Sequence, residues 1–161
     1  MGVLQPHGGS RSLFRRTPLT AELRNPVIVI HSLTQAIAAL AVAVRAGRPV
    51  VLASPPDAGG YVGPGWFKGL VAAAREAVPE ARFSALLDCG DSVGAALAAI
   101  RAGSEGVVFT GRPDVARRLA DIAGQHRVHF ETDRPAPALD LTDDFFASQE
   151  SLEQRCAEFL G

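Results

Sequence analysis

From Pro26 onward the chain repeats one unit of about 25 residues: a short apolar run, a turn, an alanine-rich stretch and a glycine before the next run. Apolar runs that show no polar alternation are typical of parallel strands covered by helices. We expect strands at 27–30, 50–53, 83–87, 106–110, 128–131 and 138–141. The repeat therefore predicts alternating β and α elements with a parallel sheet.

The stretches between these runs carry helix signals. Ser32 followed by Gln35 has the spacing of a capping box, and Gly47 stands where a helix commonly ends. Pro113 suits the first turn of a later helix, because its missing N–H has no intrahelical partner there. The predicted helices are 33–46, 66–77, 92–101, 113–124 and 149–160.

Two α/β architectures fit this order of elements. One is half of an eight-stranded TIM-type barrel, which needs a partner to cover its open strand edges. The other is an open doubly wound sheet of the flavodoxin-like or Rossmann-like kind. A complete barrel takes about 250 residues, more than the 161 of this chain. We expect a flexible N-terminal tail, 1–25, and a single α/β domain, 26–161.

Composition excludes several classes of function. Sixteen basic residues oppose seventeen acidic ones, for a net charge of -1, so no global field attracts nucleic acid or an anionic membrane. No run is apolar enough for a membrane span. Cys89 and Cys156 stand far apart, which argues against a disulfide scaffold or a zinc knuckle and favours a reducing cytoplasm.

Polar residues follow the predicted strands, and ligands bind at the carboxyl ends of parallel strands in both architectures. The candidate ligand-binding residues are Ser54, Asp91, Thr110 and Arg112. Ser, Thr and Asp are also the commonest helix caps, so capping remains the alternative explanation for several of them. Arg112 has a similar alternative, an ordinary ion pair with Asp114.

Asp88 and Cys89 form the most specific motif, because a strand delivers a carboxylate and a thiol onto the Gly90 turn. A carboxylate there suits general acid–base catalysis, and a thiolate is a good metal ligand. The alternative is a half-buried cysteine beside a capping aspartate.

The run from about Ser32 to Gly111 resembles the early barrel of class II, zinc-dependent fructose- and tagatose-bisphosphate aldolases. In that family the second strand ends in a serine-bearing loop with Tyr-x-Gly a few residues on, as in Ser54 and Tyr61-Val62-Gly63. A strand ending Leu-Asp-His-Gly follows, which here is Leu87-Asp88-Cys89-Gly90. The similarity covers about half of the chain.

The resemblance implies that Asp88 is the catalytic residue and that Cys89 replaces a zinc-ligand histidine. Thr110 stands where the family has an acidic residue, and the later zinc histidines belong to strands that this chain lacks. A catalytic zinc needs about three protein ligands, so a zinc or other divalent metal would have an incomplete ligand set. If the chain is an enzyme, the resemblance implies a carbon–carbon lyase.

We therefore expect an aldolase-like half-barrel with a pocket for a small phosphorylated or carboxylated metabolite, without full class II catalysis. The alternative is a non-catalytic interaction or regulatory module that works as a homodimer. A half-barrel is also expected to dimerise, to cover its edges. Neither function involves nucleic acid or a membrane.

Overall fold

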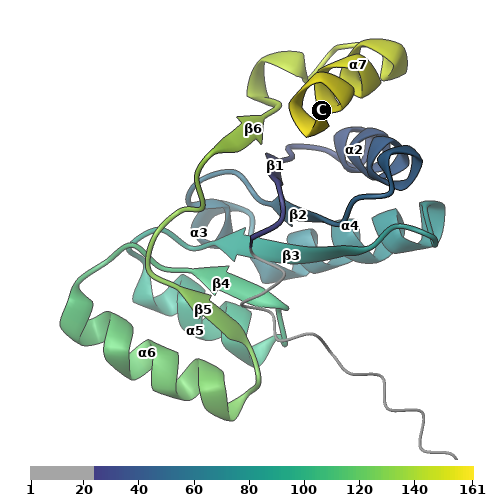
Figure 1. Cartoon of the computed structure of the whole chain (residues 1–161). Coiled ribbons are helices and arrows are strands. Elements are labelled where there is room, and N and C mark those ends of the chain that lie inside the picture. Colours follow the sequence, from purple (N-terminus) through teal and green to yellow (C-terminus); the bar gives the residue numbers. More distant parts are fainter. Residues whose placement is uncertain (1–23) are drawn as a thin grey trace, which may run out of the picture.

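The computed structural model describes residues 24–161, so residues 1–23 of the predicted tail lie outside it. The described residues contain one six-stranded sheet in which all pairs are parallel. Its strands are β1 (Val27–Val29), β2 (Val50–Ala53), β3 (Phe83–Asp88), β4 (Gly106–Val108), β5 (His129–Glu131) and β6 (Ala138–Asp140). Their order is β5-β4-β3-β2-β1-β6, so five strands are sequential neighbours and the sixth returns beside β1 (Figure 1).

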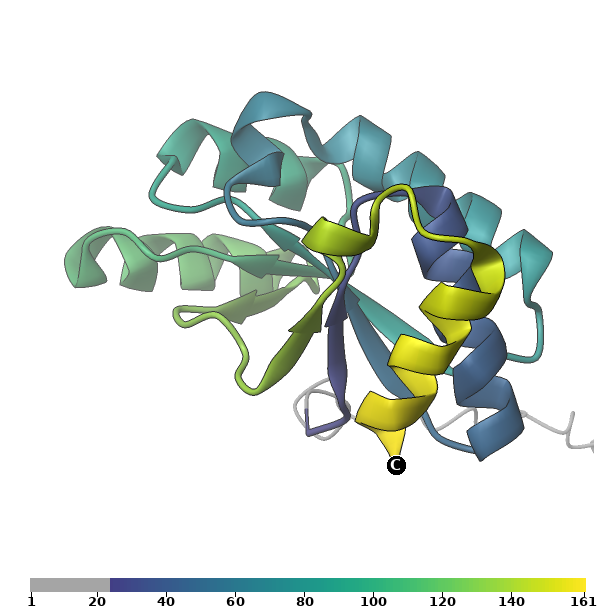
Figure 2. The same ribbon diagram turned by 90° about the horizontal axis from the view of Figure 1, so that it is seen from above.

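The longer helices form a single row along one face of the sheet. In space the row runs α7 (Gln149–Leu160), α2 (Leu33–Ala46), α4 (Pro64–Ala77), α5 (Val93–Arg101) and α6 (Pro113–Gln125) (Figure 2). Right-handed crossovers between sequential neighbours place successive helices on the same face, which explains the row. Two short elements, α3 (Ala58–Tyr61) and the 3-10 helix η1 (Thr142–Asp144), follow β2 and β6.

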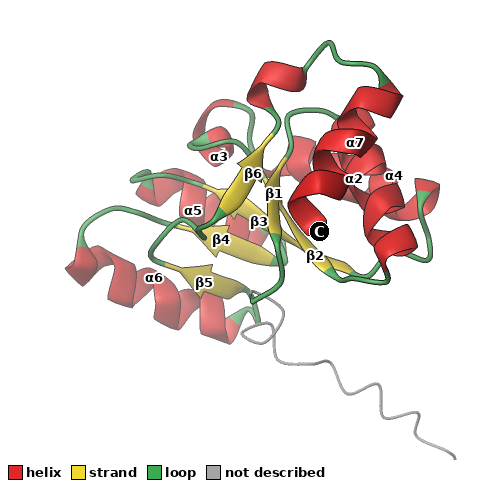
Figure 3. Ribbon diagram, turned by 45° about the horizontal axis from the view of Figure 1, so that its top comes forward, coloured by secondary structure: helices red, strands yellow, loops and turns green. Residues whose placement is uncertain are grey.

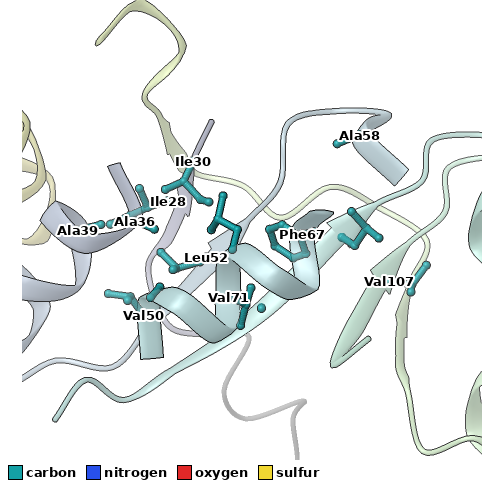
Figure 4. Packing of buried hydrophobic residues seen from close by; sticks show 14 of the residues in the cluster. Ile28, Ile30, Ala36, Ala39, Val50, Leu52, Ala58, Phe67, Val71 and Val107 are labelled. Carbon is teal, nitrogen blue, oxygen red and sulfur yellow. The ribbon is translucent and has the colours of Figure 1, made fainter. Parts of the chain in front are cut away.

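Alternate side chains of β1, β2, β3 and β4 supply two separate apolar clusters. Ile28 and Leu52 point toward the helices and pack in the main core with Phe67 (Figure 4), and Leu87 belongs to the same core. Their neighbours on the opposite, helix-free face form a second cluster, made of Val27, Val51, Ala53, Leu86 and Val108. Both clusters are buried. Burial on both faces explains why these strands show no polar alternation in sequence.

The link 132–137 joins β5 to β6 at opposite edges of the sheet (Figure 3). Parallel strands normally need a crossover of a dozen or more residues. An extended chain reaches about 3.3–3.6 Å per residue, so the six residues of this link can run from one edge of the sheet to the other without a helix.

Most predicted elements are confirmed to within two residues. Ser32 caps α2 by accepting a hydrogen bond from Gln35 N, and Gly47 ends that helix with a left-handed φ of 63°. The predicted boundaries were wrong in three places: α4 begins earlier, at Pro64, β4 ends earlier, at Val108, and the loop after β2 contains α3. None of the helices within residues 24–161 combines the length and apolar character of a membrane span.

Gln35 joins α2 to the segment after β6 and should be costly to remove. Its buried side chain accepts from His31 N at 2.7 Å and donates to Leu141 O at 2.8 Å. Gln35→Ala leaves both backbone groups without these partners, so we expect the free energy of unfolding to fall by about 2–3 kcal/mol. Urea denaturation measures this loss, and the exposed neighbour Thr34→Ala should lose much less. Equal losses in the two variants would contradict the role of Gln35.

Candidate functional site

The site is organised around the carboxylate of Asp88, the last residue of the central strand β3. Asp88 lies on the same side of its strand as Leu86, which places its side chain on the helix-free face. It is only 4% exposed. Four protein donors bind it. Oδ1 accepts from Asp57 N at 3.0 Å and Gly90 N at 2.9 Å, and Arg134 donates through Nε to Oδ2 at 2.6 Å and through Nη2 to Oδ1 at 3.2 Å.

Arg134 comes from the link 132–137, and its guanidinium grips Asp88 with the two-pronged geometry that suits a planar carboxylate. Nη2 also lies 3.3 Å from Asp57 Oδ1. The hydrogen bond to Asp88 is the main cause that raises the pKa of Arg134. The link that crosses the sheet is therefore held at its middle by one charged pair.

The loop after β2 packs closely on the turn after β3. Asp57 has a left-handed φ of 63° and points its backbone N–H at Asp88. Gly90 has a φ of 54°, and a Cβ there would come within 1.8 Å of Asp57 Oδ1. A Cβ on Gly59 would come within 2.6 Å of the Cys89 sulfur. A side chain at Gly90 would thus displace the Asp57 carboxylate and strain a backbone with positive φ.

Ser54 lies beside Asp88, as the sequence predicted for neighbouring strand ends, but it serves the backbone. Its Oγ accepts from Asp88 N at 2.8 Å and donates to Pro55 O at 3.1 Å. The residue is buried, with 2% exposed. Because its hydroxyl already donates one hydrogen bond and accepts another, Ser54 joins β2 to β3 and offers little to a ligand.

Cys89 points away from this cluster into the main apolar core. Burial, together with the nearby Asp88 carboxylate, raises the pKa of its thiol to about 12. Metal ligation requires a thiolate. Residues 24–161 also contain no group of three or more His, Cys, Asp or Glu side chains that could hold a metal ion. The described residues therefore offer Cys89 no partners for the predicted zinc role.

The other predicted residues lie apart from Asp88. Asp91 is exposed on the turn before α5. Arg112 points into solvent and pairs with Asp114, as the ordinary alternative proposed. Thr110 lines a hollow of about 460 Å³ between the start of α6 and the link. The polar residues that line this hollow are Thr110, Arg117, Thr132 and Asp133.

A second polar cluster joins the carboxyl ends of β1 and β6. His31 Nε2 lies 2.7 Å from both Asp140 Oδ1 and Thr142 Oγ1. Burial raises the pKa of Asp140, but hydrogen bonds from His31 and Thr142 outweigh burial and hold it below its ordinary value. A proton relay needs the carboxylate and the hydroxyl on opposite ring nitrogens. Because both use Nε2, this cluster cannot act as a catalytic triad.

Sequence reasoning missed Arg134, Asp57 and Arg117. Arg134 binds Asp88 across 46 positions of the chain, and no local pattern signals such a pair. The one available signal was the position of Asp133 and Arg134 directly after the fifth strand, where a charged side chain reaches the carboxyl edge.

Neither the protein-family models nor the curated proteins give a match to this sequence. The resemblance to class II aldolases therefore stays a prediction.

Loss of Arg134 should destabilise the fold far more than loss of an exposed arginine. Arg134→Met leaves the buried Asp88 carboxylate with only its two backbone donors. Since hydrogen bonds to charged groups contribute about 1.5–3 kcal/mol, we expect a loss of about 2 kcal/mol in urea denaturation. Arg112→Met, which breaks an exposed pair, should cost less than about 1 kcal/mol. A similar small cost for Arg134→Met would show that the pair with Asp88 does not hold the link.

The thiol of Cys89 should resist alkylation in the folded protein. With a pKa of about 12, only about one thiol in ten thousand is ionised at pH 8. Unfolding returns the thiol to a pKa of about 8.5. The unfolded chain then releases its proton first, so the free energy of unfolding should fall as the pH rises above about 8.5. Iodoacetamide labelling at pH 8 with and without urea tests the first point, and rapid labelling of native Cys89 would contradict it.

Proposed function

We propose that this chain is an aldolase-like half-barrel that binds a small phosphorylated or carboxylated metabolite at the carboxyl edge of its sheet and lacks full class II aldolase catalysis. The half-barrel part of the proposal is supported by five sequential parallel strands and by the row of helices on one face. A cytoplasmic location belongs to the same proposal and is in keeping with two free, buried cysteines.

The proposal that the chain lacks full catalysis rests on the hydrogen bonds that the Asp88 carboxylate already accepts. A general base must reach the proton of its substrate with a free oxygen lone pair. Here Oδ1 accepts three hydrogen bonds and Oδ2 is held at 2.6 Å by Arg134. Asp88 therefore positions the two loops and the link, and only Oδ2 keeps a lone pair without a hydrogen bond, in a residue that is 4% exposed.

The hollow between α6 and the link is the best candidate for the ligand. It lies at the carboxyl ends of β4 and β5, where both predicted architectures bind ligands. Arg117 and the hydroxyls of Thr110 and Thr132 line it and suit an anionic, oxygen-rich group. The Asp133 carboxylate lies in the same wall and favours a ligand that also carries hydroxyl donors. A sugar phosphate or hydroxy acid meets both requirements.

Arg117 and Arg118 offer a matched test, because they are adjacent on α6 and only Arg117 lines the hollow. We expect dihydroxyacetone phosphate to shift the amide NMR signals of Thr110 and Thr132. Arg117→Ala should weaken its binding at least tenfold, and Arg118→Ala should leave it nearly unchanged. Binding that is equal in the two variants, or absent from the wild type, would end the metabolite proposal.

A separate assay tests the non-catalytic part. The purified chain with added zinc should not exchange the C3 protons of dihydroxyacetone phosphate above the rate in buffer. Exchange that disappears in Asp88→Asn would show instead that Asp88 acts as an acid–base group.

The second candidate is a non-catalytic, homodimeric interaction or regulatory module. It is favoured by the open edges of the sheet, since β5 and β6 each pair with one neighbour among the described strands. Both edge strands have three residues, which limits the backbone left unpaired. Sedimentation of the purified chain decides whether it dimerises, and a monomer would contradict this second candidate.

A further inference from the structure

The carboxyl edge of the sheet carries a gathering of exposed apolar side chains. Of the seven large apolar residues that are exposed among the described ones, all but Val44 follow the carboxyl ends of four adjacent strands. In the spatial order β3, β2, β1 and β6 they are Val93, Tyr61 with Val62, Leu33, and Phe145 with Phe146. We call these six residues the apolar rim.

Phe146 is the most exposed of them, at 96%, and stacks edge-on against Phe145 with ring centroids 5.1 Å apart. A fully solvated phenylalanine contributes nothing to the core of its own domain. An exposed aromatic pair is unusual on a folded protein, and aromatic residues are enriched at interaction sites. The Phe145–Phe146 pair is therefore suited to contact a partner protein.

The same segments are strongly acidic. Residues 31–34, 54–66, 88–94 and 140–150 contain seven Asp and Glu side chains and no Lys or Arg. Arg134 and Arg155 reach in from elsewhere and offset two of these charges, at Asp88 and Asp144. Five negative charges remain in a chain whose net charge is -1. Exposed Asp57, Asp91, Asp143 and Glu150 place charge around the apolar rim.

We propose that the apolar rim is a docking surface for a partner protein that presents a cationic amphipathic helix. The apolar face of this helix would cover Phe145, Phe146 and Tyr61, and the Lys and Arg side chains of the helix would pair with the surrounding carboxylates. Charge complementarity favours this occupant, because the net negative charge of these segments repels an acidic partner and an anionic membrane. Four adjacent strands span about 15 Å, which about 10–14 residues of helix cover.

The proposal is independent of the metabolite hollow, which lies beyond β4 and β5 at the other end of the same edge. None of the residues of the apolar rim lines that hollow. Failure of either proposal therefore leaves the other standing.

The probe is a fluorescein-labelled synthetic helix of about 14 residues built from leucine and lysine in amphipathic order, titrated with the full chain and followed by fluorescence anisotropy. We expect saturable, salt-sensitive binding. Phe146→Ser should weaken it at least tenfold, as is usual for a central aromatic contact. Val44→Ser is the matched control, because Val44 is exposed on α2 away from the apolar rim and should leave binding unchanged. Both changes affect exposed side chains, and circular dichroism confirms that the variants fold.

Three further outcomes separate the occupants. A helix with glutamate in place of lysine should not bind, and equal binding would overturn the charge argument. Phe146→Ser that converts a dimer to a monomer would assign the surface to a second copy and overturn the proposal. The N-terminal segment carries Arg11, Arg15 and Arg16. If the probe binds only after all three are changed to glutamate, the chain's own segment is the occupant, which also overturns the proposal.

Discussion

The geometry of the carboxyl edge of the sheet depends on the hydrogen bonds that the buried Asp88 carboxylate accepts. It ends the central strand and collects donors from the loop after β2, from its own turn and from the link to β6. A shared ionised acceptor fixes these segments relative to one another. Charge-assisted hydrogen bonds are about twice as strong as neutral ones, which suits this task. An aspartate at a strand end can thus organise a site without taking part in chemistry.

The one-sided helix layer explains why the link matters. With the longer helices on one face, the helix-free face must bury Val51, Leu86 and Val108 by other means. The link 132–137 runs from one edge of the sheet to the other and contacts Asp88 through Arg134. The Arg134–Asp88 pair ties this link to the middle of the sheet.

The elements could be predicted because their signals are local. Ser32, Gln35 and Gly47 act within one helix, and the apolar runs record burial on both faces of the sheet. The positions of strand ends followed from the same pattern, which correctly brought Ser54 next to Asp88. The roles of these residues could not be read in this way. Whether Asp88 is free or occupied depends on Arg134, which is 46 positions away.

The errors at element ends have a similar origin. Thr110 was predicted inside a strand, but its N–H donates to Gly90 O in the turn after β3, and β4 stops at Val108. The conformation of Asp57 likewise follows from the acceptor that its N–H finds on Asp88. From the sequence alone, the Cys89 side chain could face either side of the sheet. Because the Asp88 side chain lies on the helix-free face, the next residue along the strand faces the helices. In each case the local sequence allowed more than one conformation, and a contact between distant segments determined which one the chain adopts.

Arg134 also lies between the two halves of the carboxyl edge. One side of the link lines the hollow through Thr132 and Asp133, and the guanidinium reaches Asp57 on the side of the apolar rim. A cationic partner that binds Asp57 competes with Arg134 for the same carboxylate oxygen, since Nη2 lies 3.3 Å from it. The stronger contacts of Arg134, at 2.6 Å and 3.2 Å to the buried Asp88, are out of the partner's reach. Docking would therefore weaken the contact between Arg134 and Asp57 and leave the ion pair between Arg134 and Asp88 intact. One arginine can in this way connect the two surfaces without destabilising the sheet.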